Sequence, residues 1–539
     1  MFNILKKYSY PLKLLTIYNP TDNLITFMKN LLEISKIVTK KKVKKIEIFD
    51  DHSLKHKNSK FNEFYNALLD GSFKNDRDAA SLLYNSTPTS DKYRQLKSRF
   101  RKRLLNTLFF LDVNLPSASN YERAYFSCNK DWTLVRILHF NKAKLTASYL
   151  AKKILTTSLK FKFADVIVNC SRILRDYASE KENYVDFEMY NDYIHTYSKI
   201  LNAEILSEEL AQKVKNIHQR AASNIGEFES EISKYCYELI DLSEKYQSPI
   251  IFFNTSLAWV NYYDLINDYA NMIEICNSAL DYINNNPVYF QNSKLATFQL
   301  KKMSAYLHLK DWKNGKLNAE RCINSFSKGS ETWFSFMQNY ALLAFHTENY
   351  INAIAIHKEV LAQSKFKKLP IIEKEKWNII GIYLNYIIES LGDDFTILKT
   401  QSNTKFKLQQ FLANPILHPP SQRVLTVHVI VAQILFLIEK KRFQGVTERI
   451  ERLKNYSTRQ FKKDEYYRIN QFIRLLQQLK KANYNPSNLS NIEKYLVNLN
   501  NQPFNDKGKL YQFEIVPFED LWNMILVRLN NSSSTGHYR

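Results

Sequence analysis

Apolar and small residues recur with the spacing of an α-helix along most of this 539-residue chain. Five segments show the pattern when each is aligned on one aromatic residue, namely Phe163, Tyr269, Trp312, Tyr350 and Phe443. A small or apolar residue follows three and ten positions later in every segment, and seven positions later in all but one. Because these offsets fall on one face of a helix, each aromatic residue is predicted to open an amphipathic helix.

Another helix is predicted upstream of these segments. The runs KLATFQLKKMSAYLHL and WFSFMQNYALLAFH repeat apolar residues with helical spacing and lie shortly before Trp312 and Tyr350. The aromatic markers are 43 residues apart from Tyr269 to Trp312 and 38 residues apart from Trp312 to Tyr350. A repeat of this length accommodates two antiparallel helices joined by short turns.

The repeat pattern resembles that of the tetratricopeptide-repeat family, in which the second helix of each pair opens after an aromatic turn and continues with small residues. ENYINAIAIHKEVLA carries Tyr350, Ala353 and Leu361 in the relation expected of that family. The repeats here are longer than the family's, and the proline that normally ends a repeat is missing. The resemblance implies an all-α fold, an α-solenoid of antiparallel helix pairs. Its concave face, made mainly of each pair's first helix, would bind a protein or peptide.

The segment DKYRQLKSRFRKRLLNTLFFLD, residues 91–112, combines a basic and an apolar half. Seven of its first thirteen residues are Lys or Arg, and the remaining residues are mostly apolar. On a helical wheel one apolar stripe forms from Tyr93, Leu96, Phe100 and Leu104. The segment is therefore predicted to be a helix that is buried in its second half and projects a cationic surface from its first half.

Two short helices are predicted before this basic helix. KFNEFYNALLDG ends at Gly71, a suitable C-cap, and NDRDAASLLYN opens with Asn75 or Asp76 as N-cap. Three helices with a basic third helix resemble a helix-turn-helix domain, whose third helix enters the DNA major groove. The resemblance implies nucleic-acid contacts from Lys92, Arg94, Lys97, Arg99, Arg101, Lys102 and Arg103. The alternative is that this basic, trihelical unit docks on the repeat array or on an acidic partner.

The composition agrees with a folded, helical chain. Nine glycines and thirteen prolines are few for this length, and sheets and tight turns need glycine. The formal net charge is +23, and residues 1–110 contribute +12 of it, with 22 Lys and Arg against 10 Asp and Glu. This asymmetry favours an anionic partner near the amino terminus, with a solvated basic surface as the alternative.

The cysteines and the amino-terminal residues indicate the cellular compartment in which the protein is expected. The chain has five widely spaced cysteines, which we predict to be small, reduced core residues and not a disulfide framework or a zinc site. They are Cys128, Cys170, Cys236, Cys276 and Cys322. Residues 1–20 have lysines among their apolar residues and no small-residue cleavage site, so no signal peptide is predicted. No window of eighteen uncharged apolar residues occurs, so we expect a cytoplasmic protein without membrane insertion.

Catalytic signatures are absent from the sequence. Phosphate-cradling loops need clustered glycines, yet the closest pair, Gly381 and Gly392, is eleven residues apart. The motifs G-x-S-x-G, H-E-x-x-H and C-x-x-C do not occur either. We therefore expect neither an enzyme nor a bound cofactor.

Two histidine-containing sites are candidate ligand sites. FDDHSLKH, residues 49–56, has histidines four residues apart that could share a helix face beside two aspartates. Flanking lysines add positive charge, so a solvated linker is favoured and no metal is expected. His357 replaces the small or apolar residue of the repeat pattern, and we expect it to be partly buried and hydrogen-bonded to a backbone carbonyl.

The predicted organisation has seven parts. They are a basic segment (1–60), a trihelical basic domain (61–115), helical repeats (116–397), a proline-containing linker loop (398–424), further repeats (425–500), a carboxyl-terminal cap (501–530) and a polar tail (531–539). IEIF, residues 46–49, is a candidate short strand.

These patterns favour a non-catalytic scaffold or adaptor that holds a protein or peptide segment on the concave face of its array. Tyr262, Tyr263, Trp333 and Tyr340 lie on predicted first helices and are candidate partner anchors, with burial in the core as the alternative. The second hypothesis is a regulator whose basic domain binds nucleic acid while the array senses a partner. A catalytic effector would need a cleft of convergent polar groups, which the sequence does not display.

Overall fold

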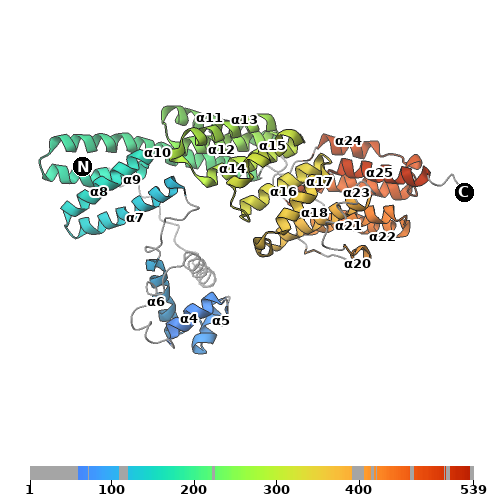
Figure 1. Ribbon diagram of the computed structural model, residues 1–539, viewed down its shortest axis with the longest axis horizontal. Helices are drawn as coiled ribbons and strands as arrows, with labels where there is room; N and C mark the ends of the chain where they lie inside the picture. The colour runs from blue at the N-terminus through green and yellow to red at the C-terminus, as the bar shows by residue number, and fades with distance from the viewer. Residues whose placement is uncertain are drawn as a thin grey trace, which may run out of the picture. The chain divides into compact units, whose positions relative to one another are not determined.

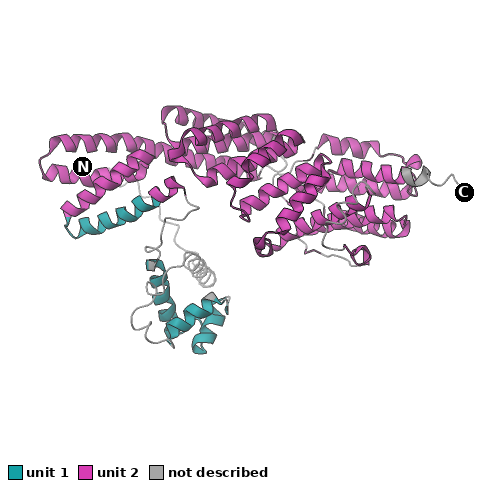
Figure 2. Cartoon of the chain, in the orientation of Figure 1, with its two compact units in different colours: residues 1–118, 125–143 teal, residues 119–124, 144–539 magenta. Residues whose placement is uncertain are grey.

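The computed structural model describes residues 59–70, 72–73, 75–107, 119–220, 225–390, 406–413, 418–419, 422–461, 466–502, 504 and 510–534. The chain divides into two compact units. Unit 1 comprises residues 1–118 and 125–143, and unit 2 comprises residues 119–124 and 144–539 (Figure 2). Every regular element in the described ranges is a helix, which confirms the predicted all-α class. The candidate strand and the metal-like cluster lie outside the described residues.

Unit 1 contains the three predicted helices, α4 (Lys60–Leu69), α5 (Asp76–Tyr84) and α6 (Asp91–Thr107), and most of α7 (Asn120–Phe140). Asn75 caps α5 as predicted, because its side chain accepts a hydrogen bond of 2.9 Å from the backbone N–H of Asp78. The first three helices enclose an aromatic core in which the buried rings of Phe64 and Phe100 have centroids 4.7 Å apart. Gly71, the predicted C-cap, lies outside the described residues.

Unit 2 is an array of helices that pack mainly against their neighbours in the sequence (Figure 1). In chain order they are α8 (Lys144–Phe161), α9 (Ala164–Glu180), α10 (Tyr184–Arg220), α11 (Ile225–Lys245), α12 (Pro249–Ile266), α13 (Tyr269–Asn285), α14 (Asn292–Leu309), α15 (Trp312–Cys322), α16 (Glu331–His346), α17 (Tyr350–Leu361), α18 (Ile371–Ser390), α20 (Leu408–Ala413), α21 (Arg423–Glu439), α22 (Phe443–Arg459), α23 (Tyr467–Lys481), α24 (Glu493–Asn501) and α25 (Phe518–Ser534). Short 3₁₀ helices occur at η2 (Pro287–Tyr289), η3 (Ile323–Ser325), η4 (Ser364–Lys368), η8 (Pro486–Asn488) and η9 (Leu510–Gln512).

The aromatic markers of the sequence pattern stand where second helices begin. Four helices start at the marker itself and α9 starts one residue after Phe163. The small and apolar residues at the predicted offsets are buried: Val166, Cys170, Ile173, Met272, Cys276, Ala279, Gly315, Ala319, Cys322, Ala353, Val360, Val446, Ile450 and Leu453. The pattern therefore identifies the buried face of each second helix.

One type of turn recurs between the helices. Between α12 and α13, Asn267 adopts the left-handed conformation with φ of 62°, and its N–H donates to the carbonyl of Asp264 while the N–H of Asp268 donates to the carbonyl of Tyr263. This pair of bonds satisfies the last carbonyls of a helix. The same arrangement recurs with the left-handed residue at Lys142, Lys162, Glu182, Lys310, Glu348 and Lys441. A residue with a Cβ adopts this conformation at a cost of about 1 kcal/mol, so glycine scarcity leaves a small strain at each turn.

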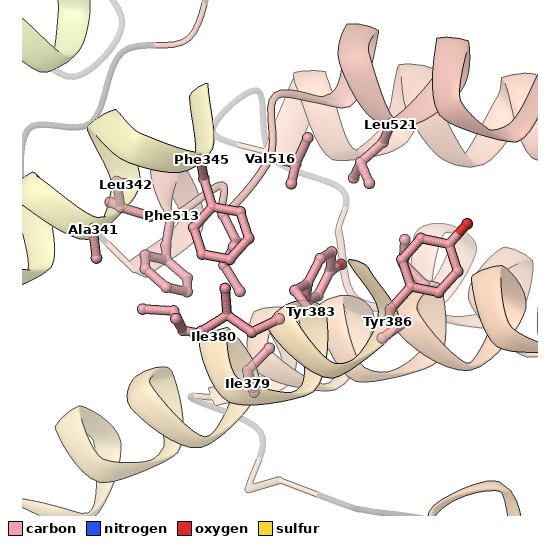
Figure 3. Close-up of a cluster of buried hydrophobic side chains, with 14 of the residues drawn as sticks. Ala341, Leu342, Phe345, Ile379, Ile380, Tyr383, Tyr386, Phe513, Val516 and Leu521 are labelled. Atoms are coloured by element: carbon pink, nitrogen blue, oxygen red, sulfur yellow. The ribbon is translucent and has the colours of Figure 1, made fainter. Parts of the chain in front are cut away.

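The end of the chain packs back onto the middle of the array. Residues 510–530, here called the returning segment, include η9 and most of α25. Phe513, Val516 and Leu521 of this segment lie in one buried cluster with Phe345 of α16 and Tyr383 of α18 (Figure 3). The same cluster contains residues from both sides of the predicted linker 398–424, in which the structure places α20. The repeats before and after that linker therefore share one core.

Two buried histidines hold the backbone of the returning segment. His346 Nε2 of α16 donates to the carbonyl oxygen of Glu514 at 3.1 Å, and His428 Nε2 of α21 donates to that of Phe513 at 2.7 Å. Because neighbouring carbonyls are bound from two different first helices, the segment is fixed in register against both.

Candidate functional site

The basic residues of α6 differ in exposure. Lys92, Arg94, Arg99 and Lys102 are exposed, and we call these four side chains the cationic face. Arg94 lies 3.7 Å from the carboxylate of Asp91, and both side chains are largely exposed, so this ion pair is weak. Within the described residues the other three cations form no ion pair with a carboxylate. The cationic face is thus open to an anionic ligand.

Lys97 belongs to the core of the trihelical domain and not to this face. Its Nζ lies 2.7 Å from Asp76 Oδ1 at the start of α5, and both residues are buried. The hydroxyl of Tyr93 donates to the same oxygen at 2.5 Å, and burial, followed by the Asp76 hydrogen bond and charge, raises the pKa of Tyr93. The prediction that Lys97 contacts nucleic acid is therefore wrong, because Asp76, 21 residues earlier, neutralises it inside the domain.

Arg101 and Arg103 occupy an intermediate position. Both are partly exposed, and the guanidinium carbon of Arg103 lies 5.2 Å from the ring centroid of Phe61 in α4. A cation over an aromatic ring is attracted by the ring's negative face, so Arg103 helps to hold α6 against α4.

Two aromatic candidates for partner binding are core residues. Trp333 is fully buried, and Tyr340 is 8% exposed and stacks on Trp312 with ring centroids 5.7 Å apart. The prediction that they anchor a partner is wrong, because α16 is enclosed by α14, α17 and the returning segment. Burial also raises the pKa of Tyr340 to about 12.

Tyr262 and Tyr263 of α12 are partly buried against Trp259. The ring centroids of the two tyrosines lie 5.3 and 5.4 Å from that of Trp259. Burial is the largest cause of the raised pKa of both phenols. These residues form one edge of a packed aromatic cluster and expose only part of their rings.

The structure reveals an apolar surface that periodicity did not single out. Of the large apolar side chains described in unit 2, the four most exposed are Leu145 and Tyr149 on α8 and Tyr184 and Val185 on α10. Their exposed fractions are 72%, 74%, 78% and 81%. We call these four side chains the apolar surface. Periodicity finds residues that face a core, whereas an apolar residue outside that stripe carries no signal until its neighbours are known.

An ion pair joins α8 and α10 beside the apolar surface. Lys152 Nζ lies 3.5 Å from Asp186 Oδ2 in the first turn of α10. Tyr149 stands three residues before Lys152, and Val185 directly precedes Asp186. Leu145 is one turn before Tyr149 on the same side of α8. The ion pair therefore links the two helices that carry the apolar surface.

A buried carboxyl group lies between α10 and α12. The hydroxyl of Ser248 donates to Glu204 Oε1 at 2.6 Å, and Glu204 is almost fully buried. Burial raises the pKa of Glu204 to about 7, against the lowering effect of the Ser248 hydrogen bond, and the carboxylates of Asp165 and Glu208 add to the rise. Ser248 also caps α12 by accepting a hydrogen bond from the N–H of Ile250 at 3.2 Å. This polar contact thus joins two helices of the array.

His357 and the cysteines have the structural roles predicted for them. His357 Nε2 donates to the carbonyl of Trp377 at 3.0 Å, and burial lowers the pKa of the imidazole. Gly381 leaves room for the ring, since a Cβ there would stand 3.0 Å from it. All five cysteines are buried, as expected of core residues.

The chain matches no protein-family model, no curated protein and no solved structure. None of the helices in the described ranges is both long and apolar enough to cross a membrane. In the same part of the chain no three His, Cys, Asp or Glu side chains are grouped as metal ligands. The cationic face and the apolar surface are accordingly the features from which function is inferred.

Proposed function

We propose that this chain is a non-catalytic interaction protein whose helical array binds a protein partner. The observation that carries the proposal is the apolar surface, in which Leu145, Tyr149, Tyr184 and Val185 are each more than 70% exposed on two adjoining helices. Exposed apolar side chains that gather on neighbouring elements are typical of protein–protein contacts.

The position of the apolar surface agrees with this role. α8 is the first helix of the pair whose second helix follows Phe163, and α10 opens the next pair. In the tetratricopeptide-repeat family such first helices form the concave, partner-binding face. Complete burial of each large apolar side chain by a partner would contribute about 1.5 kcal/mol or more, before the cost of association. Two tyrosines supply contact area at a small loss of side-chain entropy.

Site-specific photocrosslinking in cells tests the proposal. A benzophenone amino acid placed at Tyr149 is expected to crosslink one protein species that the same probe at Ile351 does not, because Ile351 is an exposed apolar residue of α17, away from the apolar surface. The crosslinked protein is then purified and its affinity for the full-length chain is measured by calorimetry.

Affinity measurements with two variants complete the test. Tyr149→Asp with Val185→Asp is expected to weaken the purified complex at least about tenfold, because two charges would enter the contact. Ile351→Asp, the matched control, is expected to leave the affinity unchanged. Equal affinities for the wild type and both variants would contradict a partner site on α8 and α10.

A further inference from the structure

We propose that the cationic face of α6 binds the phosphate backbone of duplex DNA. The cationic face belongs to unit 1 and the apolar surface to unit 2, so this activity is separate from the partner binding proposed for the array.

The spacing of the cations suits a polyanion. Lys92, Arg99 and Lys102 stand at positions i, i+7 and i+10 of one helix, so they line one side of it over roughly 15 Å. Duplex DNA carries one negative charge per about 1.7 Å of its axis. Several phosphates therefore lie within reach of these side chains at once, and each contact releases a condensed counterion.

The chemistry between the cations favours nucleic acid over an acidic protein or a membrane. The exposed residues from Lys92 to Lys102 are the four cations together with Gln95 and Ser98, which donate and accept hydrogen bonds. The apolar residues of this stretch, including Leu96 and Phe100, are buried. Protein interfaces and membrane-binding helices present an apolar centre or face as well as charge, and this stretch of α6 presents none.

The helix is held rigidly before any ligand binds. The buried contact of Asp76 with Lys97 and Tyr93 ties the start of α5 to the middle of α6. On the buried side of α6, which also carries Tyr93 and Lys97, Phe100 packs on Phe64 of α4. Because the backbone under the cationic face is already ordered, binding pays little further conformational entropy.

Groove dimensions favour DNA over RNA. α6 has 17 residues and is roughly 25 Å long, and the major groove of B-form DNA, about 12 Å wide, admits an α-helix. The major groove of A-form RNA is too deep and narrow for side chains to read.

Fluorescence anisotropy with the full-length, nuclease-treated protein and a labelled DNA duplex tests the proposal. Between about 50 and 200 mM salt, four phosphate contacts predict a slope of about −3.6 in a plot of log affinity against log salt, a loss of roughly 100-fold. The variant with Lys92, Arg94, Arg99 and Lys102 all changed to Gln is expected to lose nearly all binding.

A matched variant controls for net charge. Lys153, Lys234, Lys313 and Lys358 are exposed on helices of unit 2, and changing all four to Gln removes the same charge. This control is expected to bind DNA like the wild type. Should the α6 variant lose its helical circular dichroism, the single variants Lys92→Gln and Lys102→Gln replace it, and each is expected to reduce the salt slope by about 0.9.

Four results would overturn the proposal. They are no binding by the wild type at the lowest salt, equal losses in the α6 and control variants, tighter binding of an RNA duplex, and tighter binding of polyglutamate or anionic vesicles through the same residues. The last result would assign the cationic face to an acidic protein or a membrane surface.

Discussion

The two halves of unit 2 use related helix pairs but bury their first helices to different extents. In the carboxyl-terminal half, α16 to α25, 15 of the 17 residues of α21 are buried, because α18, α22 and the returning segment all pack on this helix. In the amino-terminal half, α8 to α15, the first helices α8 and α10 keep the apolar surface exposed. The repeat pattern sets the helix pairs, but the course of the chain's own end determines which first helices remain open to a partner.

Buried ionisable groups distinguish the halves as well. The carboxyl-terminal half encloses Arg468 with two glutamates and contains the neutral histidines His346 and His428. The amino-terminal half encloses Glu204, whose pKa burial raises to about 7. Lowering the pH should therefore destabilise the carboxyl-terminal half and stabilise the amino-terminal half.

The largest effect is expected from Arg468→Met, which removes the ion pairs between α23 and the returning segment. Arg468 Nε lies 2.7 Å from Glu514 Oε1 and its Nη2 lies 2.8 Å from Glu519 Oε2. Without the guanidinium, the buried Glu514 carboxylate has no counter-charge, and we expect a loss of about 3–5 kcal/mol. Hydrogen exchange of α16 and α25 measures this loss.

Arg474→Met is the control, because Arg474 is exposed on the same helix. It should change the free energy of unfolding obtained from exchange by less than about 0.5 kcal/mol. Equal effects of the two substitutions would contradict the role of Arg468 in holding the returning segment.

Acid should loosen the carboxyl-terminal half. Burial lowers the pKa of His346 to about 3 and that of His428 to about 4, from an ordinary 6.5. Their stabilisation is present above pH 6.5 and is lost as the pH falls, by about 2 kcal/mol per histidine at pH 5. No hydrogen-bond partner for Nδ1 of either ring exists in the described part of the chain, so an added proton enters an apolar site.

Urea unfolding at pH 7.5 and pH 5, followed by the fluorescence of the buried Trp333, Trp377 and Trp522, measures this acid effect. His428→Gln should remove the contribution of one histidine, about 2 kcal/mol between pH 7.5 and pH 5. His195→Gln, at an exposed site, should remove none. A carboxyl-terminal half with the same stability at both pH values would remove the contrast between the halves.

The amino-terminal half should respond in the opposite direction through Glu204. The folded pKa of Glu204, about 7, exceeds the unfolded value of 4.5. The free energy of unfolding of the amino-terminal half is therefore greatest at low pH and falls as the pH rises between these two values. Glu204→Gln is therefore expected to stabilise α10 and α12 by about 3 kcal/mol at pH 8 and by less than about 0.5 kcal/mol at pH 4.5. Hydrogen exchange of α10 and α12 measures this stabilisation, and Glu238→Gln, at an exposed residue, is the control. A gain of the same size at both pH values would disprove the titration.

The smallest effect should be the same in both halves. Glu182 and Lys441 occupy the left-handed position of equivalent turns, with φ of 54° in each case. Replacing either by Gly should stabilise its half by about 0.5–1 kcal/mol, because glycine adopts this conformation without steric cost. Lys440→Gly, at a neighbouring residue with negative φ, should destabilise instead. Thermal unfolding measures all three, and unequal gains would show that the shared turns differ in strain.

Local patterns in the sequence predicted much of this fold. The aromatic markers at Tyr269, Trp312 and Tyr350 stand at the first residues of second helices, and His357 finds the carbonyl partner expected of it. These features depend on residues within one helix pair or its neighbour. Periodicity and capping report such short-range relations directly.

Features that depend on distant residues were missed. Burial of Trp333 and Tyr340 requires helices and a returning segment that no local pattern places beside α16. Lys97 looked like its exposed neighbours because Asp76 lies 21 residues earlier. The apolar surface was missed for the complementary reason, since exposure of Tyr149 depends on nothing covering it in the folded array. The sites were therefore less predictable than the helices.

The returning segment also affects how the protein emerges from the ribosome. Its carbonyl at Glu514 meets His346, which is 168 residues earlier in the chain. At a synthesis rate of about 5–20 residues per second, α16 waits roughly 10–30 s for this contact. The contacts between α8 and α10 close over fewer than 40 residues, as for Lys152 and Asp186, so the amino-terminal half can fold while its successor is still being made. During that interval the apolar residues of α16, α18 and α21 lack their final cover, and such transiently exposed apolar surface promotes aggregation.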